Sequence, residues 1–552
     1  MTGYYDLGGY TRPVTTSSAA ARAWFIRGLL WAYAFNHEEA AACFERAIEA
    51  DPGCALAHWG LAYALGPNYN KPWEAFDPAE AAAVGPRARA ATRAAERCSA
   101  AAAPAEQALV RALAFRYPSP AGPAGDGAER NRQYAGAMRE AYREHPDDLD
   151  VAALYADALM NLTPWALWDT RTGEPAAGAA TTEIKEVLER ALGAPGGRAH
   201  PGLLHFYIHL MEMSAHPEDA LWAGDLLRDL APDAGHLRHM PTHLDVLCGD
   251  YRRVVTSNHT AIEADGKFLA ERGPMNFYTL YRAHNYHFAI YGAMFLGRAQ
   301  AALAAADQLA AAIPASLLQV ESPPMADWLE GFVPMKLHVL IRFGRWPEII
   351  AAPLPADRDL YCVTTALTHY AKGIAHAASG DVPAAREQQA LFTAAAGRVP
   401  ASRTIFNNTC ADILAVAAAM LDGEIEYRAG NYRAAFAGLR HAVELDDGLP
   451  FDEPWAWMQP ARHAYGALLL EQDRVTEAEA VYRADLGLDD TLPRPGQHPG
   501  NVWSLHGYHE CLARLGKHEL AAVIGQQLKL AAAQADVPVT ASCYCRPPAA
   551  AG

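Results

Sequence analysis

The amino-acid sequence predicts an all-α fold in which antiparallel helix pairs stack into a superhelical solenoid. Three observations predict it. Small and aromatic residues recur with the spacing of a helix–turn–helix repeat of about 34 residues. Almost no segment alternates apolar and polar residues with a period of two, as a half-buried strand does. The 552-residue chain is otherwise rich in Ala and Leu, and 51% of its residues are apolar, which is enough to bury a large core.

The first repeat opens at Ala21 and is the most regular one. Its small, aromatic and proline markers are Trp24, Gly28, Trp31, Ala40, Phe44, Ala47 and Pro52. Two regular copies near the carboxyl end are marked by Gly430, Tyr432, Ala435, Leu439 and Ala442, and by Gly466, Leu469, Ala478 and Tyr482. Weaker copies open near Pro201, Gly235, Ala283, Glu330 and Ala366. We therefore expect helix pairs in both halves of the chain.

Segments rich in Gly, Pro and Ala interrupt this pattern at residues 117–127, 171–180 and 193–202, as is typical of linkers. They predict four sections. These are N-terminal helical repeats (1–116), a helical connector with loops (117–200), central histidine-rich repeats (201–400), and C-terminal repeats with a cysteine-containing tail (401–552).

Eight of the 22 histidines share one register of the central repeats. They fall only at places 2, 5 and 9 of a repeat: His205, His209, His236, His239, His243, His284, His287 and His338. Residues three and four apart lie on one face of an α-helix. Because the first helix of each repeat lines the concave surface of such a solenoid, we expect these imidazoles to converge in one groove.

A cluster of several imidazole side chains favours a bound metal ion. Protonated rings repel one another, and buried neutral rings need partners for both nitrogens, whereas coordination satisfies one nitrogen of each neutral ring. Eight histidines exceed the needs of one site, so we expect two ions. Nitrogen ligands suit copper, zinc, iron or nickel. We favour copper, because paired ions with about three imidazoles each suit dioxygen chemistry, and keep zinc and iron as alternatives.

Two further residues are candidates for catalysis. Glu212 follows His209 by three residues on the same stripe, which suits an outer ligand, an orienting group or a proton carrier. His338 is a second candidate for that role. Tyr291 is one of several tyrosines expected to line a substrate pocket, although core packing is the commoner role of such residues.

Other segments are candidates for closing the site. The tryptophan-bearing loops at residues 68–73 and 162–169 predict a rim or a lid. His37 lies in a turn, where we expect it to be exposed unless its loop folds over the groove. Cys543 and Cys545 belong either to a disordered tail or to a tail that offers thiolate ligands to the groove.

Charge and motifs exclude several classes of protein. The chain has 46 basic and 63 acidic residues, a net charge of −17, which opposes binding to nucleic acid. It has no apolar run of about 18 residues and no signal-like start, so we expect a cytoplasmic protein without a membrane partner. No phosphate-binding glycine loop, HExxH helix or GxSxG elbow occurs. The cysteines, mostly isolated in apolar segments, suggest reduced thiols.

Several segments together resemble a group of bacterial tetratricopeptide-repeat (TPR) proteins. These are YAFNHEEAAACFERAIEADP, AHWGLAYALGPNYNKPW, HFYIHLMEMSAHPEDAL, GHLRHMPTHLDVLCGDY, HNYHFAIYGAMFLGR and EPWAWMQPARHAYGALLLEQDRVTEAEAVYRADL. The resemblance runs over most of the chain, and the histidine segments are specific to that group. It implies a TPR-like α-solenoid and no particular reaction.

The sequence supports three hypotheses of function. The first is a metal-dependent oxidoreductase that oxidises a small organic molecule or a peptide side chain in the concave groove with dioxygen at a copper pair. The second is a zinc-dependent hydrolase at the same histidines, in which zinc lowers the pKa of a bound water. The third is a non-catalytic TPR scaffold that presents its groove to a protein partner.

Overall fold

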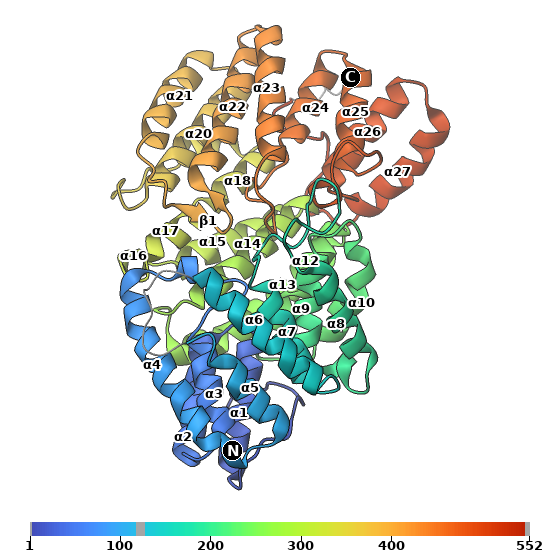
Figure 1. Cartoon of the computed structure of the whole chain (residues 1–552). Coiled ribbons are helices and arrows are strands. Elements are labelled where there is room, and N and C mark those ends of the chain that lie inside the picture. Colours follow the sequence, from blue (N-terminus) through green and yellow to red (C-terminus); the bar gives the residue numbers. More distant parts are fainter. Residues whose placement is uncertain (1–2, 118–126, 547–552) are drawn as a thin grey trace. The chain divides into compact units, whose positions relative to one another are not determined.

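The computed structural model describes residues 3–117 and 127–546 and confirms the all-α fold (Figure 1). The described residues form 27 α-helices. Their only sheet is a two-stranded antiparallel one, β1 (Thr404–Ile405) with β2 (Asn408–Thr409). Short 3-10 helices connect other elements at Trp73–Ala75, Ser99–Ala101, Gly197–Ala199, Pro217–Ala220, Glu330–Phe332 and Arg494–Gly496.

The chain divides into two compact units. Unit 1 comprises Met1–Leu244 and Thr260–Arg282, and unit 2 comprises Asp245–His259 and Ala283–Gly552. Each boundary falls within a helix: α12 (Pro241–Leu247), α13 (Tyr251–Arg272) and α14 (Thr279–Phe295) contribute residues to both units. Of the expected linkers, residues 171–180 form the turns between α7 and α8, and residues 118–126 lie outside the described part of the chain.

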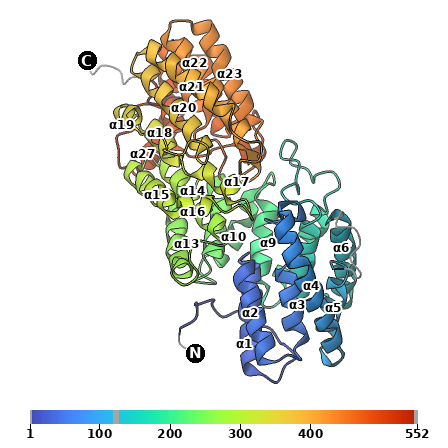
Figure 2. The same ribbon diagram turned by 90° about the vertical axis from the view of Figure 1, so that its left-hand side faces the viewer.

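Unit 1 is a succession of helix pairs, of which the first five helices stand side by side (Figure 2). Its helices are α1 (Ala19–Tyr33), α2 (His37–Ala50), α3 (Ala55–Ala64), α4 (Pro78–Cys98), α5 (Pro104–Leu113), α6 (Gly127–Glu144), α7 (Leu149–Met160), α8 (Thr181–Gly193), α9 (Pro201–Met211), α10 (Leu221–Leu227) and α11 (Gly235–His239).

The first helix pair shows how the repeat markers fix the packing. The side chains of Ser18 and Asn36 accept hydrogen bonds from backbone N–H groups at the starts of α1 and α2. A Cβ atom at Gly28 would lie 2.8 Å from the Phe44 ring, and one at Gly60 would lie 2.4 Å from it. The ring of Phe44 therefore needs both glycines, which explains the spacing of these markers in the sequence.

Unit 2 shows the same packing of an aromatic ring against two glycines. Its further helices are α15 (Ala299–Ala312), α16 (Ala315–Leu318), α17 (Met325–Leu329), α18 (Met335–Arg342), α19 (Trp346–Ala351), α20 (Cys362–Ala378), α21 (Val382–Ala396), α22 (Cys410–Arg428), α23 (Tyr432–Asp447), α24 (Ala461–Glu471), α25 (Val475–Asp485), α26 (Val502–Arg514) and α27 (His518–Ala532). A Cβ atom at Gly466 or Gly507 would lie 2.5 or 2.3 Å from the Tyr482 ring. An aromatic ring thus again packs against two glycine-bearing helices.

The described part of the carboxyl-terminal tail, up to residue 546, packs within unit 2. The hydroxyl groups of Ser542 and Tyr482 lie 2.5 Å apart, and Arg342 donates to the Ser542 carbonyl at 3.4 Å. Cys543 and Cys545 are buried and form a disulfide. The alternative of a disordered tail is therefore wrong for these two cysteines, and offering thiolate ligands would first require reduction of the disulfide. The other seven cysteines are free, as expected.

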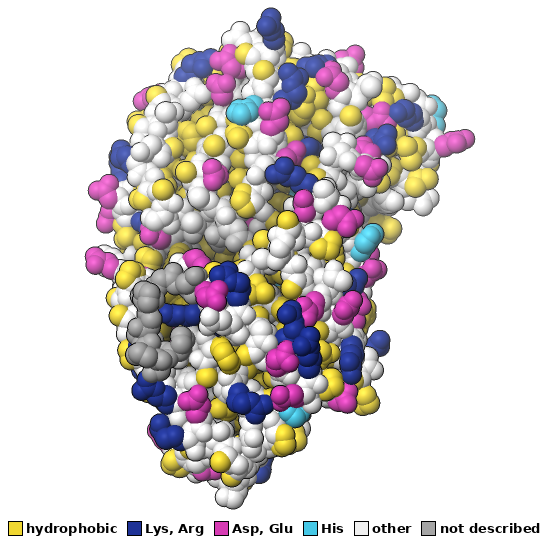
Figure 3. Space-filling view, in the orientation of Figure 1, with side chains coloured by type: hydrophobic (Ala, Val, Ile, Leu, Met, Phe, Trp, Pro, Cys, Tyr) yellow, Lys and Arg dark blue, Asp and Glu magenta, His cyan; other side chains and the backbone are white. Residues whose placement is uncertain are grey.

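The surface carries both signs of charge interspersed over the face seen in Figure 3. Few imidazoles appear there, which agrees with the burial of most of the predicted histidines. Among the described residues, no helix combines the length and the apolar character that crossing a membrane requires.

Candidate metal centre

Five of the eight predicted histidines lie in unit 1, on three of its helices. The helix α9 carries His205 and His209, α11 carries His236 and His239, and α12 carries His243. Their side chains are buried, with exposed fractions of 0% or 1%. The predicted groove would have left such rings open to solvent, whereas the structure encloses them within the core.

Three of these imidazoles converge. The ligand nitrogens of His205, His209 and His236 all lie within 4.8 Å of one another. Nitrogens that share a tetrahedral ion, each about 2.0–2.1 Å from the metal, are separated by about 3.4 Å. A small inward movement of the rings is therefore enough for the three nitrogens to hold one ion.

The two α9 histidines are oriented by their Nδ1 atoms. His205 Nδ1 lies 2.6 Å from the Tyr33 carbonyl oxygen, and His209 Nδ1 lies 2.9 Å from Oε1 of Glu212. Both oxygens are acceptors, so each Nδ1 carries the proton and donates. The Nε2 atom of each ring is then a free lone pair, and both Nε2 atoms are buried without a partner. Metal-binding histidines in proteins are held in this way.

Glu212 forms hydrogen bonds with His209 on α9 and with His243 on α12. Its second oxygen, Oε2, accepts from His243 Nδ1 at 2.6 Å, and its side chain is fully buried. The Nε2 atom of His243 lies 2.8 Å from the Nε2 atom of His239. Glu212 therefore orients imidazoles through hydrogen bonds, which is one of the roles that its position in the sequence predicts.

Burial keeps His205 and His209 neutral. Desolvation lowers the pKa of His209 to about 3. It also lowers the pKa of His205 well below its usual value, and the nearby His209 adds to the effect. The neutral ring is the form that binds a metal ion.

Phe35 packs directly on the three converging imidazoles. Its ring centroid lies 4.6 Å from that of His205, 5.7 Å from that of His209 and 5.5 Å from that of His236. The ring thus closes one side of the candidate site and removes water from it.

The two predicted lid loops also contact the site. Tyr69, in the loop at residues 68–73, lies 5.0 Å from the His209 ring. Trp165, in the loop at residues 162–169, lies 5.9 Å from the same ring. Each of the two loops thus places an aromatic ring against His209, and their role as a rim or a lid stays a prediction.

Two of the covering aromatics have unusual backbones. Phe35 has a φ of 54° and Trp165 a φ of 58°. A bulky residue rarely adopts this left-handed conformation, which the surrounding structure must enforce. Such residues concentrate at functional sites, and here both of them contact His209.

A pocket of about 340 Å³ within unit 1 is lined in part by Phe35. Its walls include Phe35, His37, Glu38, Lys71, Phe76 and Phe277. The Nδ1 atom of His37 lies 3.1 Å from the Ala64 carbonyl oxygen, and its Nε2 atom is buried without a partner. Burial lowers the pKa of His37 to about 4. The expectation that His37 is an exposed turn residue is therefore wrong.

The remaining predicted residues lie in unit 2. His284, His287 and Tyr291 are on α14, and His338 is on α18. The Tyr291 ring stacks on Phe295 at 4.3 Å, and its buried hydroxyl group has no hydrogen-bond partner. Burial raises the pKa of this hydroxyl well above its usual value.

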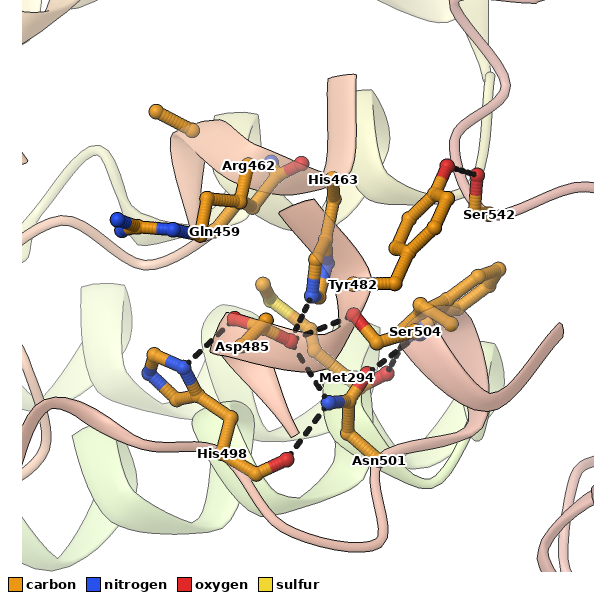
Figure 4. A network of polar contacts seen from close by, with 12 residues as sticks. Met294, Gln459, Arg462, His463, Tyr482, Asp485, His498, Asn501, Ser504 and Ser542 are labelled. Carbon is orange, nitrogen blue, oxygen red and sulfur yellow. Dashed lines mark hydrogen bonds and ion pairs between the residues drawn. The ribbon is translucent and has the colours of Figure 1, made fainter. Parts of the chain in front are cut away.

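The structure also reveals a polar network in unit 2 that the repeat register did not predict (Figure 4). Asp485, at the end of α25, is fully buried and accepts from four side chains. The donors are His463 Nε2 at 3.0 Å, His498 Nδ1 at 2.9 Å, Asn501 Nδ2 at 3.0 Å and Ser504 Oγ at 2.5 Å.

This network stabilises the junction of helices rather than a nucleophile. Ser504 donates its proton to Asp485, whereas a catalytic serine donates to an imidazole. His463 and His498 hold the pKa of the Asp485 carboxyl well below its usual range. His463 and His498 lie outside the metal register, so only the pairing of α24, α25 and the following loop brings them together.

Comparison with protein-family models and with curated proteins finds no match. Among solved structures, the chain is similar to the structure of Naa15/Naa10 bound to HypK-THB, with 14% identity, coverage of 93% of this chain and 70% of that chain, and a TM-score of 0.22. It is also similar to yeast Tom70, with 11% identity, coverage of 91% and 90%, and a TM-score of 0.24. The helices of this chain are those of an all-α protein in which successive helices pack against each other in pairs.

Proposed function

We propose that this chain is a copper-dependent oxidoreductase in which His205, His209 and His236 hold a metal ion inside unit 1. One observation carries the proposal. Two buried imidazoles are each fixed through Nδ1 and have an unpartnered Nε2 atom, and one ring nitrogen of each lies within 4.8 Å of a ring nitrogen of His236. Leaving such lone pairs buried without a partner costs about 1–3 kcal/mol each, and a bound ion removes that cost.

The donor set favours a transition metal. The three converging groups are neutral nitrogens, and Glu212 is engaged with His209 and His243 rather than offered as a hard oxygen ligand. Nitrogen ligands suit copper, zinc and iron, whereas magnesium and calcium prefer oxygen. Copper and iron both exchange electrons with dioxygen and an organic substrate, and non-haem iron sites of that kind include a carboxylate ligand, which the three imidazoles lack.

His239 and His243 supply donors for a second ion. Their Nε2 atoms lie 2.8 Å apart, and the Nδ1 atom of His243 is held by the same carboxylate that orients His209. Glu212 thus links the orientation of the two groups of ligands. This arrangement supports the assignment of Glu212 as the positioning residue of a two-ion centre.

The adjacent pocket suits a small organic substrate such as a phenol or an amine. Its volume of about 340 Å³ is at the lower end of the range for small-molecule sites. Glu38 and Lys71 offer charges, and Phe76 and Phe277 offer apolar faces. Phe35 forms a wall of both the pocket and the imidazole cluster, so a bound molecule lies one ring away from the ligands.

The reaction we propose is a two-electron oxidation. The substrate loses two electrons and two protons, and dioxygen takes them up to give hydrogen peroxide. Burial of the ligands and their aromatic cover exclude water, which strengthens the hydrogen bonds that orient the imidazoles.

Elemental analysis of tag-free protein tests the proposal. We expect a stoichiometric metal in the wild type and its loss in the double variant His205→Gln/His209→Gln. The matched control is His216→Gln, because the His216 side chain is in the same unit and 72% exposed. We further expect Glu212→Gln to keep the site but to weaken metal binding about 10- to 100-fold, as loss of an orienting partner does.

An absorption spectrum and a peroxide assay then distinguish the alternatives. Copper predicts d–d absorption in the oxidised protein and peroxide production from a phenol or an amine. Zinc without such bands, together with ester or peptide hydrolysis, would support the hydrolase instead. If the protein retains no metal after titration with copper, zinc and iron, only the hypothesis of a non-catalytic scaffold for a protein partner would remain.

A further inference from the structure

We propose that unit 2 contains a separate, sulfur-bearing metal site, formed by His287, His338 and Met458, that binds a cuprous ion. Met458 lies outside the histidine register, in the loop that precedes α24. The site goes beyond the all-nitrogen centre of unit 1, because it adds a soft thioether donor to two imidazoles.

The contact between His287 and Met458 is the first observation. His287 Nε2 lies 2.8 Å from the Met458 sulfur, and both side chains are fully buried. This separation is normal for a nitrogen–oxygen hydrogen bond, and sulfur is a larger atom and a weak acceptor. The two donor atoms are therefore pressed together without the energy of a good hydrogen bond.

The second observation is that His338 is tied to the same loop. The Nε2 group of Gln459 donates to the His338 carbonyl oxygen at 2.7 Å. The ring of Trp457 packs edge-on against the His338 imidazole, with centroids 5.2 Å apart. Residues on both sides of Met458 thus hold α18 against the loop, while Met458 itself contacts α14.

The third observation is the lack of hydrogen-bond partners. The Nδ1 atoms of His287 and His338 are both buried without one. Phe332 packs against His287 at 5.3 Å and adds only an apolar face. An ion bound between His287 Nε2 and the Met458 sulfur leaves His287 Nδ1 as it is, so the unpaired nitrogen that coordination would satisfy is the buried Nδ1 atom of His338.

The ligand chemistry selects the ion. Thioether sulfur is soft and uncharged, and proteins use it with imidazole for monovalent copper. Zinc takes thiolate, imidazole and carboxylate ligands instead. Two neutral imidazoles and one thioether in a buried site therefore match a singly charged, soft cation better than a doubly charged one.

Titration of the full chain with cuprous ion in the presence of a chromogenic cuprous chelator tests this site. We expect Met458→Leu to bind one cuprous ion fewer per chain, or to bind it at least about tenfold more weakly, than the wild type. The matched control is Met420→Leu, which removes another buried methionine of unit 2 from α22. It should leave the stoichiometry unchanged.

X-ray absorption at the copper edge provides a readout that needs no substitution. In cuprous-loaded protein whose methionines are replaced by selenomethionine, we expect a copper–selenium distance. Absence of that distance, or equal cuprous binding by wild type and Met458→Leu, would show that the contact is packing alone. Loss of metal in His205→Gln/His209→Gln with the copper–selenium signal retained would separate this site from the centre of unit 1.

Discussion

At the scale of single residues, burial controls the charge of the ionisable side chains. His209 and His37 have their pKa values lowered by desolvation to about 3 and about 4, so both rings are neutral at physiological pH. Burial of an acidic side chain instead raises its pKa, because desolvation disfavours the charged form. Glu424, in α22, is 4% exposed, and burial raises the pKa of its carboxyl group to about 7.

Glu424 makes the stability of unit 2 depend on pH. Its pKa rises from 4.5 in the unfolded chain to about 7 in the folded one, so the folded state holds the proton more tightly between these values. The free energy of unfolding therefore falls as pH rises from 4.5 to 7 and is constant above. Glu424→Gln should remove this loss, which amounts to roughly 3 kcal/mol.

Denaturant titrations at pH 4, 6 and 8 measure that effect as the difference between variant and wild type. The variant should gain relative stability between pH 4 and 6 and again between pH 6 and 8, with no further gain above about pH 7. Glu444→Gln is the control, because the Glu444 side chain is 74% exposed in the neighbouring helix. A constant difference between Glu424→Gln and wild type at all three pH values would contradict the assignment.

At the scale of elements, the sequence predicted the features that follow from periodic spacing of residues, namely helix pairs and shared helix faces. The spacing of Gly28 and Phe44 predicted the first helix pair, because the ring and the glycine must meet across that pair. The three- and four-residue spacing of histidines predicted that His205 and His209 share a face and that His236 joins them. These relations lie within one repeat or between neighbouring repeats.

What the sequence did not predict depends on contacts between distant segments. The Tyr33 carbonyl group that orients His205 lies 172 residues away, and Met458 lies 171 residues from His287. The positive φ of Phe35 follows from tertiary packing and has no local signal such as glycine. The repeat pattern also did not predict that the imidazole rings of unit 1 are buried, because the residues that cover them come from α1 and the two tryptophan-bearing loops, which are distant in the sequence.

The turn between α1 and α2 should control access to the metal centre. Phe35 is 3% exposed and contacts three imidazole rings. In Phe35→Ala the pocket and the imidazoles would no longer be separated by a ring. We expect a chelator to extract the metal at least about tenfold faster, and the variant to lose about 3–5 kcal/mol of stability.

Stopped-flow transfer of the metal to a chromogenic chelator measures this rate. Phe115→Ala serves as the control, because the Phe115 side chain belongs to the same unit and is 50% exposed. A rate equal to that of the wild type in Phe35→Ala would mean that metal leaves by another route.

At the scale of the whole molecule, the helix repeats form two units that each have a hydrophobic core. The large core of unit 1 includes Phe44, Trp59 and Leu204, and a core cluster of unit 2 is formed by Leu340, Ile349, Ala371 and Ala375. Units with separate cores are expected to unfold as separate cooperative transitions. The metal centre proposed for His205, His209 and His236 draws all of its ligands from unit 1.

Metal binding should therefore raise one of two unfolding transitions. An ion that binds the folded state alone stabilises it by about 2.7 kcal/mol at a concentration 100 times its dissociation constant. For a unit of this size, that corresponds to an increase in melting temperature of roughly 5–10 °C. Differential scanning calorimetry of the metal-free chain, with and without added cupric ion, measures the shift, because the thioether site proposed in unit 2 favours the cuprous ion. His205→Gln/His209→Gln should abolish it and His216→Gln should retain it, whereas an equal shift in all three proteins would assign the bound copper to other ligands.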